Sequence, residues 1–134
     1  MILEIIGLII LAALFQIFKH SFLPDILGID LLLFSTVIAS SHYGFIPGLF
    51  VAILPITISS FFRFRMSMII ALTLLITIAL ISSVLEIQLF YLGLITAFIY
   101  SLLTFIIFRL IDKDTLIFSI TYFVFNIILF KIFF

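Results

Sequence analysis

The chain has 134 residues, of which 67% are hydrophobic and 9% are charged, and its formal net charge is zero. A soluble globular domain averages about 45–50% apolar and about 25% charged residues, so this composition excludes a soluble enzyme and predicts an all-α, polytopic bundle in a lipid bilayer. The absence of a basic excess excludes a nucleic-acid partner, and the absence of cysteine excludes disulfides and thiolate metal sites.

The apolar runs predict six transmembrane helices with short loops in a single domain, residues 1–134. A helix needs about 20 residues to cross about 30 Å of hydrocarbon. The apolar stretch 66–108 is about twice that length, so the turn is expected at Glu86, the charged residue inside it. In chain order, the predicted helices are about 2–18, 26–41, 45–62, 66–85, 89–108 and 115–134.

Basic residues fall mainly on one side of this predicted bundle. The loops after the first, third and fifth helices contain Lys19, Arg63, Arg65, Arg109 and Lys113, whereas the opposite side has Lys131. The positive-inside rule therefore predicts a multi-pass protein of the cell membrane, with these three loops cytoplasmic and both termini outside. The first apolar run contains Glu4 and no basic n-region, so we expect a retained helix rather than a signal peptide.

Small residues recur at four-residue steps in two of the predicted helices. The two series are Gly44, Gly48 and Ala52, and Gly93, Ala97 and Ser101. Membrane helices associate where small side chains let two backbones approach closely, so these series are predicted helix-packing positions. A bundle of six helices needs several such faces, which favours internal packing. The alternative is a dimer face or a substrate passage. The expected partners are other membrane-protein subunits or a second copy of the chain.

Asp30 is the most informative ionisable position, because a carboxylate within the bilayer is expected to face protein or trapped water. It is predicted to lie about one turn inside the second helix. An ion, proton or cationic-substrate contact is one interpretation, and an interfacial salt bridge to Arg63 or Arg65 is the favoured one. Gln16 and Asn126 are single amides in apolar helices, and we expect them to form hydrogen bonds between helices.

A second group of polar residues is predicted at the outer turns. His42 and Tyr43 precede Gly44 between the second and third helices, at the same level as Glu86. These residues form either a small-ligand mouth or a solvated turn, and the solvated turn is favoured because loops gather polar residues in any case. The candidate substrate-binding residues are Asp30, His42, Tyr43 and Glu86.

Signatures of catalysis are missing from the sequence. It has no H-E-x-x-H, no Gly-rich phosphate loop, no G-x-S-x-G and no paired carboxylates on one helix face. We therefore predict no enzymatic activity, no catalytic or metal-ligating residues and no cofactor.

From Asp30 to Arg65 the residues follow a familiar order. An acidic residue opens the second helix, and a Tyr-Gly turn leads into a third helix that starts with proline and glycine. The matching residues are Asp30, Tyr43, Gly44, Pro47 and Gly48. This stretch resembles the second and third helices of S components of energy-coupling-factor vitamin transporters, and equally those of MreD-type rod-shape-determining proteins. Members of both families look cytoplasmic at both termini, opposite to the orientation predicted from the charges.

The two resemblances imply different functions. The first implies a substrate-binding or transport subunit of a larger membrane complex, with an unidentified small-molecule ligand among the outer ends of the helices. The second implies a non-enzymatic membrane scaffold or assembly protein. A third interpretation, from the residues alone, is a small ion or proton pathway that uses Asp30 and Glu86.

Overall fold

The computed structural model describes residues 1–22, 30–62, 66–108 and 115–134. These ranges contain six helices and no strand, which confirms the all-α class. The helices are α1 (Ile2–Phe22), α2 (Leu32–Tyr43), α3 (Phe45–Phe62), α4 (Met66–Val84), α5 (Leu89–Phe108) and α6 (Thr115–Phe133).

Three of the helices have the length and composition of a membrane crossing, rather than all six as predicted. They contain the segments Ile2–Lys19, Leu89–Phe108 and Thr115–Phe133. The apolar segments Phe45–Phe61 and Met68–Val84 are somewhat shorter. Helix α2 has only 12 residues, or about 18 Å of rise, and is therefore too short to cross about 30 Å of hydrocarbon.

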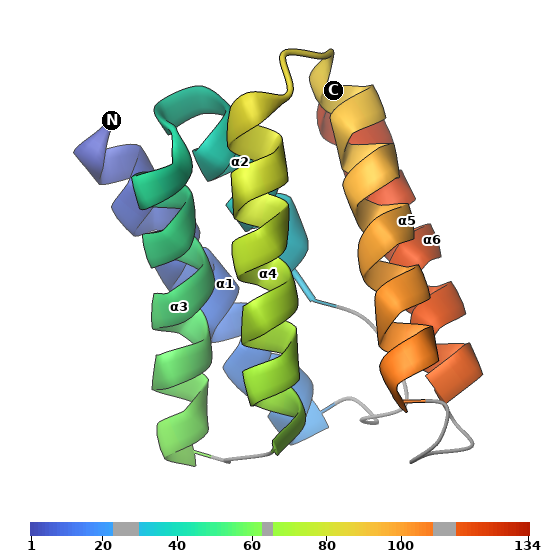
Figure 1. The fold of residues 1–134 in the computed structure, drawn as a ribbon. Coiled ribbons are helices and arrows are strands. Elements are labelled where there is room, and N and C mark those ends of the chain that lie inside the picture. Colours follow the sequence, from blue (N-terminus) through green and yellow to red (C-terminus); the bar gives the residue numbers. More distant parts are fainter. Residues whose placement is uncertain (23–29, 63–65, 109–114) are drawn as a thin grey trace.

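Helix α2 is also the centre of the bundle. It contacts each of the other five described helices, and its residues from Leu32 to Val37 are all buried. Figure 1 shows this short helix in the part of the bundle nearest the two termini, which lie at the same end. The last turns of α3 and α5 and the first turns of α4 and α6 lie at the opposite end (Figure 1).

Helices α5 and α6 pack as a pair beside the other four. The backbone contacts of this pair with the rest of the described chain are made through α2 and α4. A stacked ring pair, Phe15 and Phe125 with centroids 6.2 Å apart, adds a side-chain contact between α1 and α6. The molecule thus consists of a helical pair and a four-helix part that meet along α2 and α4.

Glycines allow two close approaches between helices. A Cβ atom added to Gly48 would lie 2.6 Å from the Cβ atom of Ser40, where α3 packs against α2. A Cβ atom added to Gly93 would lie 2.4 Å from the Phe130 ring, where α5 packs against α6. Ala52, Ala97 and Ser101, from the same two series, are buried. Apart from Gly44, both series therefore lie along contacts within the chain.

Gly44 has a different role from the packing predicted for it. Its φ of +99° and ψ of 179° are accessible essentially to glycine alone, and its N–H donates to the Ser40 carbonyl at 3.1 Å. A Cβ atom added to Gly44 would meet no other part of the described chain within 4 Å. Gly44 is therefore required by the backbone of the turn between α2 and α3, and not by a close helix approach.

The end of α1 and the start of α2 differ most from the predicted helix limits. Helix α1 continues to Phe22, so Lys19 lies inside a helix and not in a loop. Helix α2 begins at Leu32, so Asp30 precedes the helix rather than lying one turn inside it. The Asp30 carboxylate accepts a hydrogen bond from the Leu32 N–H at 3.1 Å. This bond satisfies an N–H of the first turn, which has no partner within the helix.

Candidate functional site

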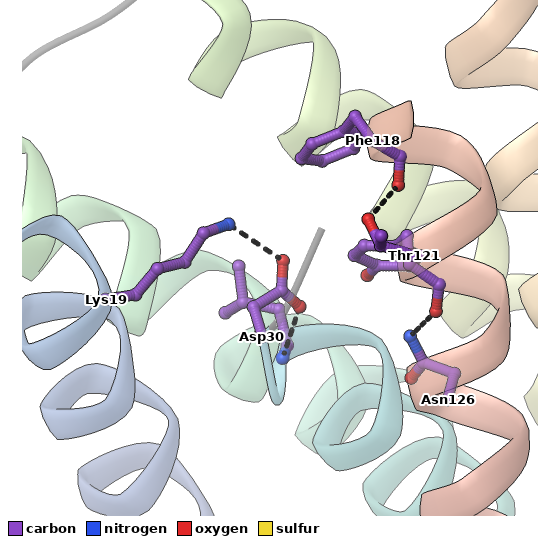
Figure 2. A network of polar contacts seen from close by, with 7 residues as sticks. Lys19, Asp30, Phe118, Thr121 and Asn126 are labelled. Atoms are coloured by element: carbon purple, nitrogen blue, oxygen red, sulfur yellow. Dashed lines mark hydrogen bonds and ion pairs between the residues drawn. The ribbon is translucent and has the colours of Figure 1, made fainter. Parts of the chain in front are cut away.

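An ion pair lies buried where α1 meets the start of α2. The Lys19 ammonium is 4.0 Å from the Asp30 carboxylate, and the two side chains are 8% and 7% exposed. Figure 2 shows Lys19 extending from α1 toward Asp30. Direct charge-assisted hydrogen bonds are about 2.7–2.9 Å long, so the two charged groups attract each other without being in hydrogen-bonding contact.

Aromatic rings from α5 and α6 form the other side of this site. Lys19 Nζ lies 5.5 Å from the centre of the Phe118 ring. Phe118 stacks on Tyr122 with centroids 5.7 Å apart, and Tyr122 stacks on Tyr100 with centroids 4.5 Å apart. A cation over an aromatic face is attracted by the ring's negative face, so the Phe118 ring is a favourable contact for the Lys19 ammonium.

The hydroxyls of the two tyrosines lie close to the acidic group. The charge of Asp30 acts on both Tyr100 and Tyr122. Tyr122 is fully buried, and its hydroxyl interacts with the Asp30 carboxylate and with the Tyr100 hydroxyl, although neither contact has ideal hydrogen-bond geometry. The site therefore combines one basic side chain, one acidic side chain and two neutral hydroxyl groups. We call the four residues Lys19, Asp30, Tyr100 and Tyr122 the central polar site.

Hydroxyl groups behave differently on the outside of the bundle and near this site. The exposed hydroxyls donate to carbonyls of their own helix, as for Thr57, Thr73, Thr77 and Ser83. The buried hydroxyl of Thr96 also donates to a carbonyl of its own helix, that of Leu92 in α5. By contrast, the buried hydroxyls of Ser101, Thr104 and Ser119 have no hydrogen-bond partner in the part of the chain that the structure describes.

These unpaired hydroxyls belong to one polar face on α5 and α6. On α6, the buried residues Thr115, Ser119, Tyr122 and Asn126 recur at helical spacing, and on α5 the adjacent buried residues are Tyr100, Ser101 and Thr104. This face was not predicted from the sequence. Its signal was present, because the buried polar residues of α6 recur at steps of four, three and four residues, the spacing of one helix face.

The amide of Asn126 differs from its prediction. Its Nδ2 donates to the Tyr122 carbonyl at 2.9 Å, within α6, rather than to another helix. Its Oδ1 is buried and has no hydrogen-bond partner among the described residues. The bond within the helix forms because residues four positions apart are neighbours on the helix surface.

The other predicted site residues lie at a different level of the bundle. His42 and Tyr43 lie at the end of α2 that is about 18 Å from its start, so they do not join Asp30. Tyr43 donates a hydrogen bond to Glu4, whose carboxylate is also 3.4 Å from the N-terminal amine. Glu86 is exposed in the turn between α4 and α5.

The predicted bridge from Asp30 to Arg63 or Arg65 involves two residues outside the described ranges. The basic partner that the structure gives Asp30 is Lys19. No group of three histidine, aspartate or glutamate side chains suited to a metal ion occurs in residues 1–22, 30–62, 66–108 or 115–134. The interactions that the structure shows at the central polar site are charge pairing, hydrogen bonding and cation–π contact.

Comparisons with known proteins found no matching family model, no matching curated protein and no matching solved structure.

Proposed function

We propose that this protein is a six-helix integral membrane protein that binds a small polar solute at the central polar site, as a substrate-binding or transport subunit of a larger membrane complex. The observation that carries the proposal is the Lys19–Asp30 pair, which is buried between helices of a highly apolar chain. Ionised side chains inside a membrane are costly, and they typically line a path or a binding site for an ion or solute.

The shape of α2 supports the same proposal. Discontinuous or short helices that end within the membrane bring a helix terminus and irregular backbone to the midplane, which is where many transporters bind their substrate. Helix α2 has 12 residues and begins at the central polar site. This placement differs from the outer helix ends, where the S-component resemblance leads us to expect the ligand.

A scaffold function has less support from the packing. A scaffold would use the small-residue series to contact its partners, but Ser40 and Phe130 of this chain lie against Gly48 and Gly93. The substitution Gly93→Leu would therefore disturb the packing of α5 on α6, and its effect on a partner could not be interpreted.

Solute binding is tested by analysing what purifies with the protein. The wild type and the double variant Lys19→Met/Asp30→Asn are extracted in native lipid nanodiscs, and small molecules released by denaturation are identified by mass spectrometry. We expect a solute in stoichiometric amount with the wild type and with Lys131→Met, an exposed control, and none with the double variant. A solute retained equally by the double variant, or absent from the wild type, contradicts the proposal.

We further propose that the end of the bundle with both termini faces outward. The remaining basic residues of the cytoplasmic prediction, Arg63, Arg65, Arg109 and Lys113, follow α3 and α5, whose ends lie opposite the termini (Figure 1). Lys19 is buried and therefore does not add to the number of basic loop residues on which the predicted orientation rests. Reporter fusions at His42 and Phe64 test the orientation, and a cytoplasmic signal at His42 would reverse it.

A further inference from the structure

We propose that the α5–α6 pair is a gate, which rotates about the turn between α4 and α5 and separates from the four-helix part at the end of the bundle opposite the termini. This motion is expected with or without a bound solute, so it goes beyond the proposed function. Its basis is how the pair is packed, how it is joined to the other four helices, and where its buried polar groups lie.

The two helices of the pair are packed closely enough to move as one body. Gly93 lets the Phe130 ring lie against the backbone of α5. Ala97 and Ser101 continue the same series of small residues along α5, and both are buried. Small side chains along a helix let a neighbouring helix approach closely, which is how helix pairs are stabilised in membranes.

The boundary between the pair and the four-helix part is packed differently. In the described ranges, the glycines against which another residue lies closely are Gly48, between α2 and α3, and Gly93, between α5 and α6, so neither is at this boundary. Large side chains meet across it, as where the Phe34 and Phe130 rings lie with centroids 5.0 Å apart. Contacts of this kind can persist while two helices shift, because the side chains can change rotamer.

A single turn joins the two parts. Helices α1 to α4 precede α5 and α6 in the chain, so residues 85–88 are the only covalent connection between the parts. These four residues are exposed and lie outside the helices, as is common for hinge residues. The turn lies at the end of the bundle with the termini (Figure 1), so a rotation about it moves the opposite end of the pair most.

Buried polar groups are concentrated in the half of the pair that this rotation moves. Ser101 and Thr104 lie in the second half of α5 and Ser119 in the first half of α6, and their hydroxyls have no hydrogen-bond partner among the described residues. In the half of α5 near the turn, the Thr96 hydroxyl donates to the Leu92 carbonyl. A buried hydroxyl without a partner is unfavourable, and water that enters on opening would supply one. Opening is therefore favoured at the end opposite the turn.

The same boundary runs through the central polar site. Lys19, in the last turn of α1, and Asp30 belong to the four-helix part, whereas Tyr122 belongs to the pair and interacts with Asp30. Separation of the two parts would break this contact and expose the ion pair to water. The gate therefore connects the central polar site with the side of the membrane opposite the termini.

Distances between spin labels test the motion, and the chain has no cysteine of its own to interfere. Phe61→Cys/Ile106→Cys places labels at the far ends of α3 and α5, and Ile46→Cys/Tyr91→Cys places them at the starts of the same helices; all four side chains are exposed. Distances are measured by double electron–electron resonance on the full chain in nanodiscs. A rotation of about 10° moves the far end of α5, about 30 Å from the turn, by about 5 Å. We expect two distances that differ by about this amount for the far labels, and one distance for the near labels.

A third pair of labels is the control for the pair of helices itself. Ile106→Cys and Leu116→Cys are exposed positions at the far ends of α5 and α6. Because both belong to the moving part, we expect a single distance between them.

Access of a water-soluble reagent provides a second, independent measurement. Ser119→Cys places a thiol in the half of the pair that opens, and Ser82→Cys places one in α4 near the turn. Both serines are buried, and both hydroxyls lack a partner in the described ranges, so the two variants are matched. With a membrane-impermeant, positively charged methanethiosulfonate, we expect Ser119→Cys to react at least about tenfold faster than Ser82→Cys, because local opening controls access.

Removing hydroxyls from the moving half should close the gate. Ser101→Ala/Thr104→Val, combined with the far labels, should reduce the population at the longer distance by at least about threefold, because water would no longer gain hydrogen bonds on opening. Thr96→Val is the matched control and should leave this population unchanged. If the hydroxyl variants fail to fold, the labelled chains without them decide by themselves.

Each result has a defined meaning. A single distance between the far labels overturns the gate, and so does a Ser119→Cys thiol that reacts no faster than that of Ser82→Cys. Two distances between the near labels would mean that the pair detaches along its whole length, which overturns the hinge. Two distances between the labels of α5 and α6 would mean that these helices do not move as one body, which also overturns the gate. None of these measurements requires a solute, so the proposed function keeps its own test.

Discussion

Removing one member of the Lys19–Asp30 pair should destabilise the protein more than removing both. Lys19→Met keeps the apolar length of the side chain and deletes its charge, which leaves the Asp30 carboxylate buried without a cation. Asp30→Asn deletes the negative charge but retains a side-chain oxygen that can still accept the Leu32 N–H. The two substitutions therefore remove the charge interaction while the Leu32 N–H keeps a side-chain acceptor at position 30.

The expected magnitude follows from the geometry of the pair. Two unit charges 4.0 Å apart attract by about 4 kcal/mol at an effective dielectric constant of about 20. Loss of one partner of a buried pair typically costs about 3–5 kcal/mol, whereas replacement of both partners by neutral groups is often close to neutral. We expect each single variant to lose about 3 kcal/mol or more of unfolding free energy, and the double variant to lose less than either.

Unfolding can be followed in mixed detergent micelles as the fraction of sodium dodecyl sulfate increases. The chain has no tryptophan, so the near-ultraviolet circular dichroism of tyrosine is the signal of choice, since Tyr100 and Tyr122 stack in the core. Lys131→Met is the control and should change the free energy by less than about 0.5 kcal/mol. If the double variant loses as much unfolding free energy as the two single variants together, the two charges do not stabilise each other.

Three further substitutions separate packing, backbone and hydroxyl effects, each measured by the same unfolding experiment. Gly93→Ala places a Cβ 2.4 Å from the Phe130 ring and should lower the unfolding free energy by about 1–3 kcal/mol. Adding Phe130→Leu should restore part of this loss, and an unchanged free energy in Gly93→Ala would contradict the contact. Gly44→Ala should lower the unfolding free energy by about 1–3 kcal/mol because alanine is strained at a φ of +99°, whereas the added Cβ would meet no neighbouring atom. An unchanged free energy would mean that the turn adopts another conformation. Tyr122→Phe removes a buried hydroxyl that interacts with Asp30 and Tyr100, so the unfolding free energy should fall by about 1 kcal/mol and solute binding should weaken. An unchanged stability would show that this hydroxyl makes no stabilising hydrogen bond.

The helices that lie between charged or turn residues were predictable from the sequence. Helices α3 and α5 have the predicted limits, 45–62 and 89–108, because a continuous apolar run must satisfy its backbone hydrogen bonds within a helix. The limits of α1 and α2 were not predictable in the same way. A lysine near a helix end can extend to water or turn inward, and an aspartate can lie inside a helix or precede it.

The candidate site was predictable only in part. Asp30 was singled out from the cost of a carboxylate in an apolar chain, and it does lie in the buried cluster. Its partner was not found, because Lys19 was counted as a loop residue. Asp30 was grouped with His42, Tyr43 and Glu86 as one set of candidate substrate-binding residues. Sequence spacing could not show how far apart these residues lie across the bundle, because that distance depends on where the short helix α2 begins and ends.

Composition and the order of apolar runs by themselves determined that this chain is helical and that most of its surface is apolar, because hydrophobicity and backbone hydrogen bonding are local properties. Only the tertiary structure decided that Lys19, Asp30, Tyr100 and Tyr122 meet, since their proximity depends on how α1, α2, α5 and α6 pack around the short central helix. The desolvation cost of burying two opposite charges is offset only where the charges lie close together, and their proximity depends on the tertiary packing.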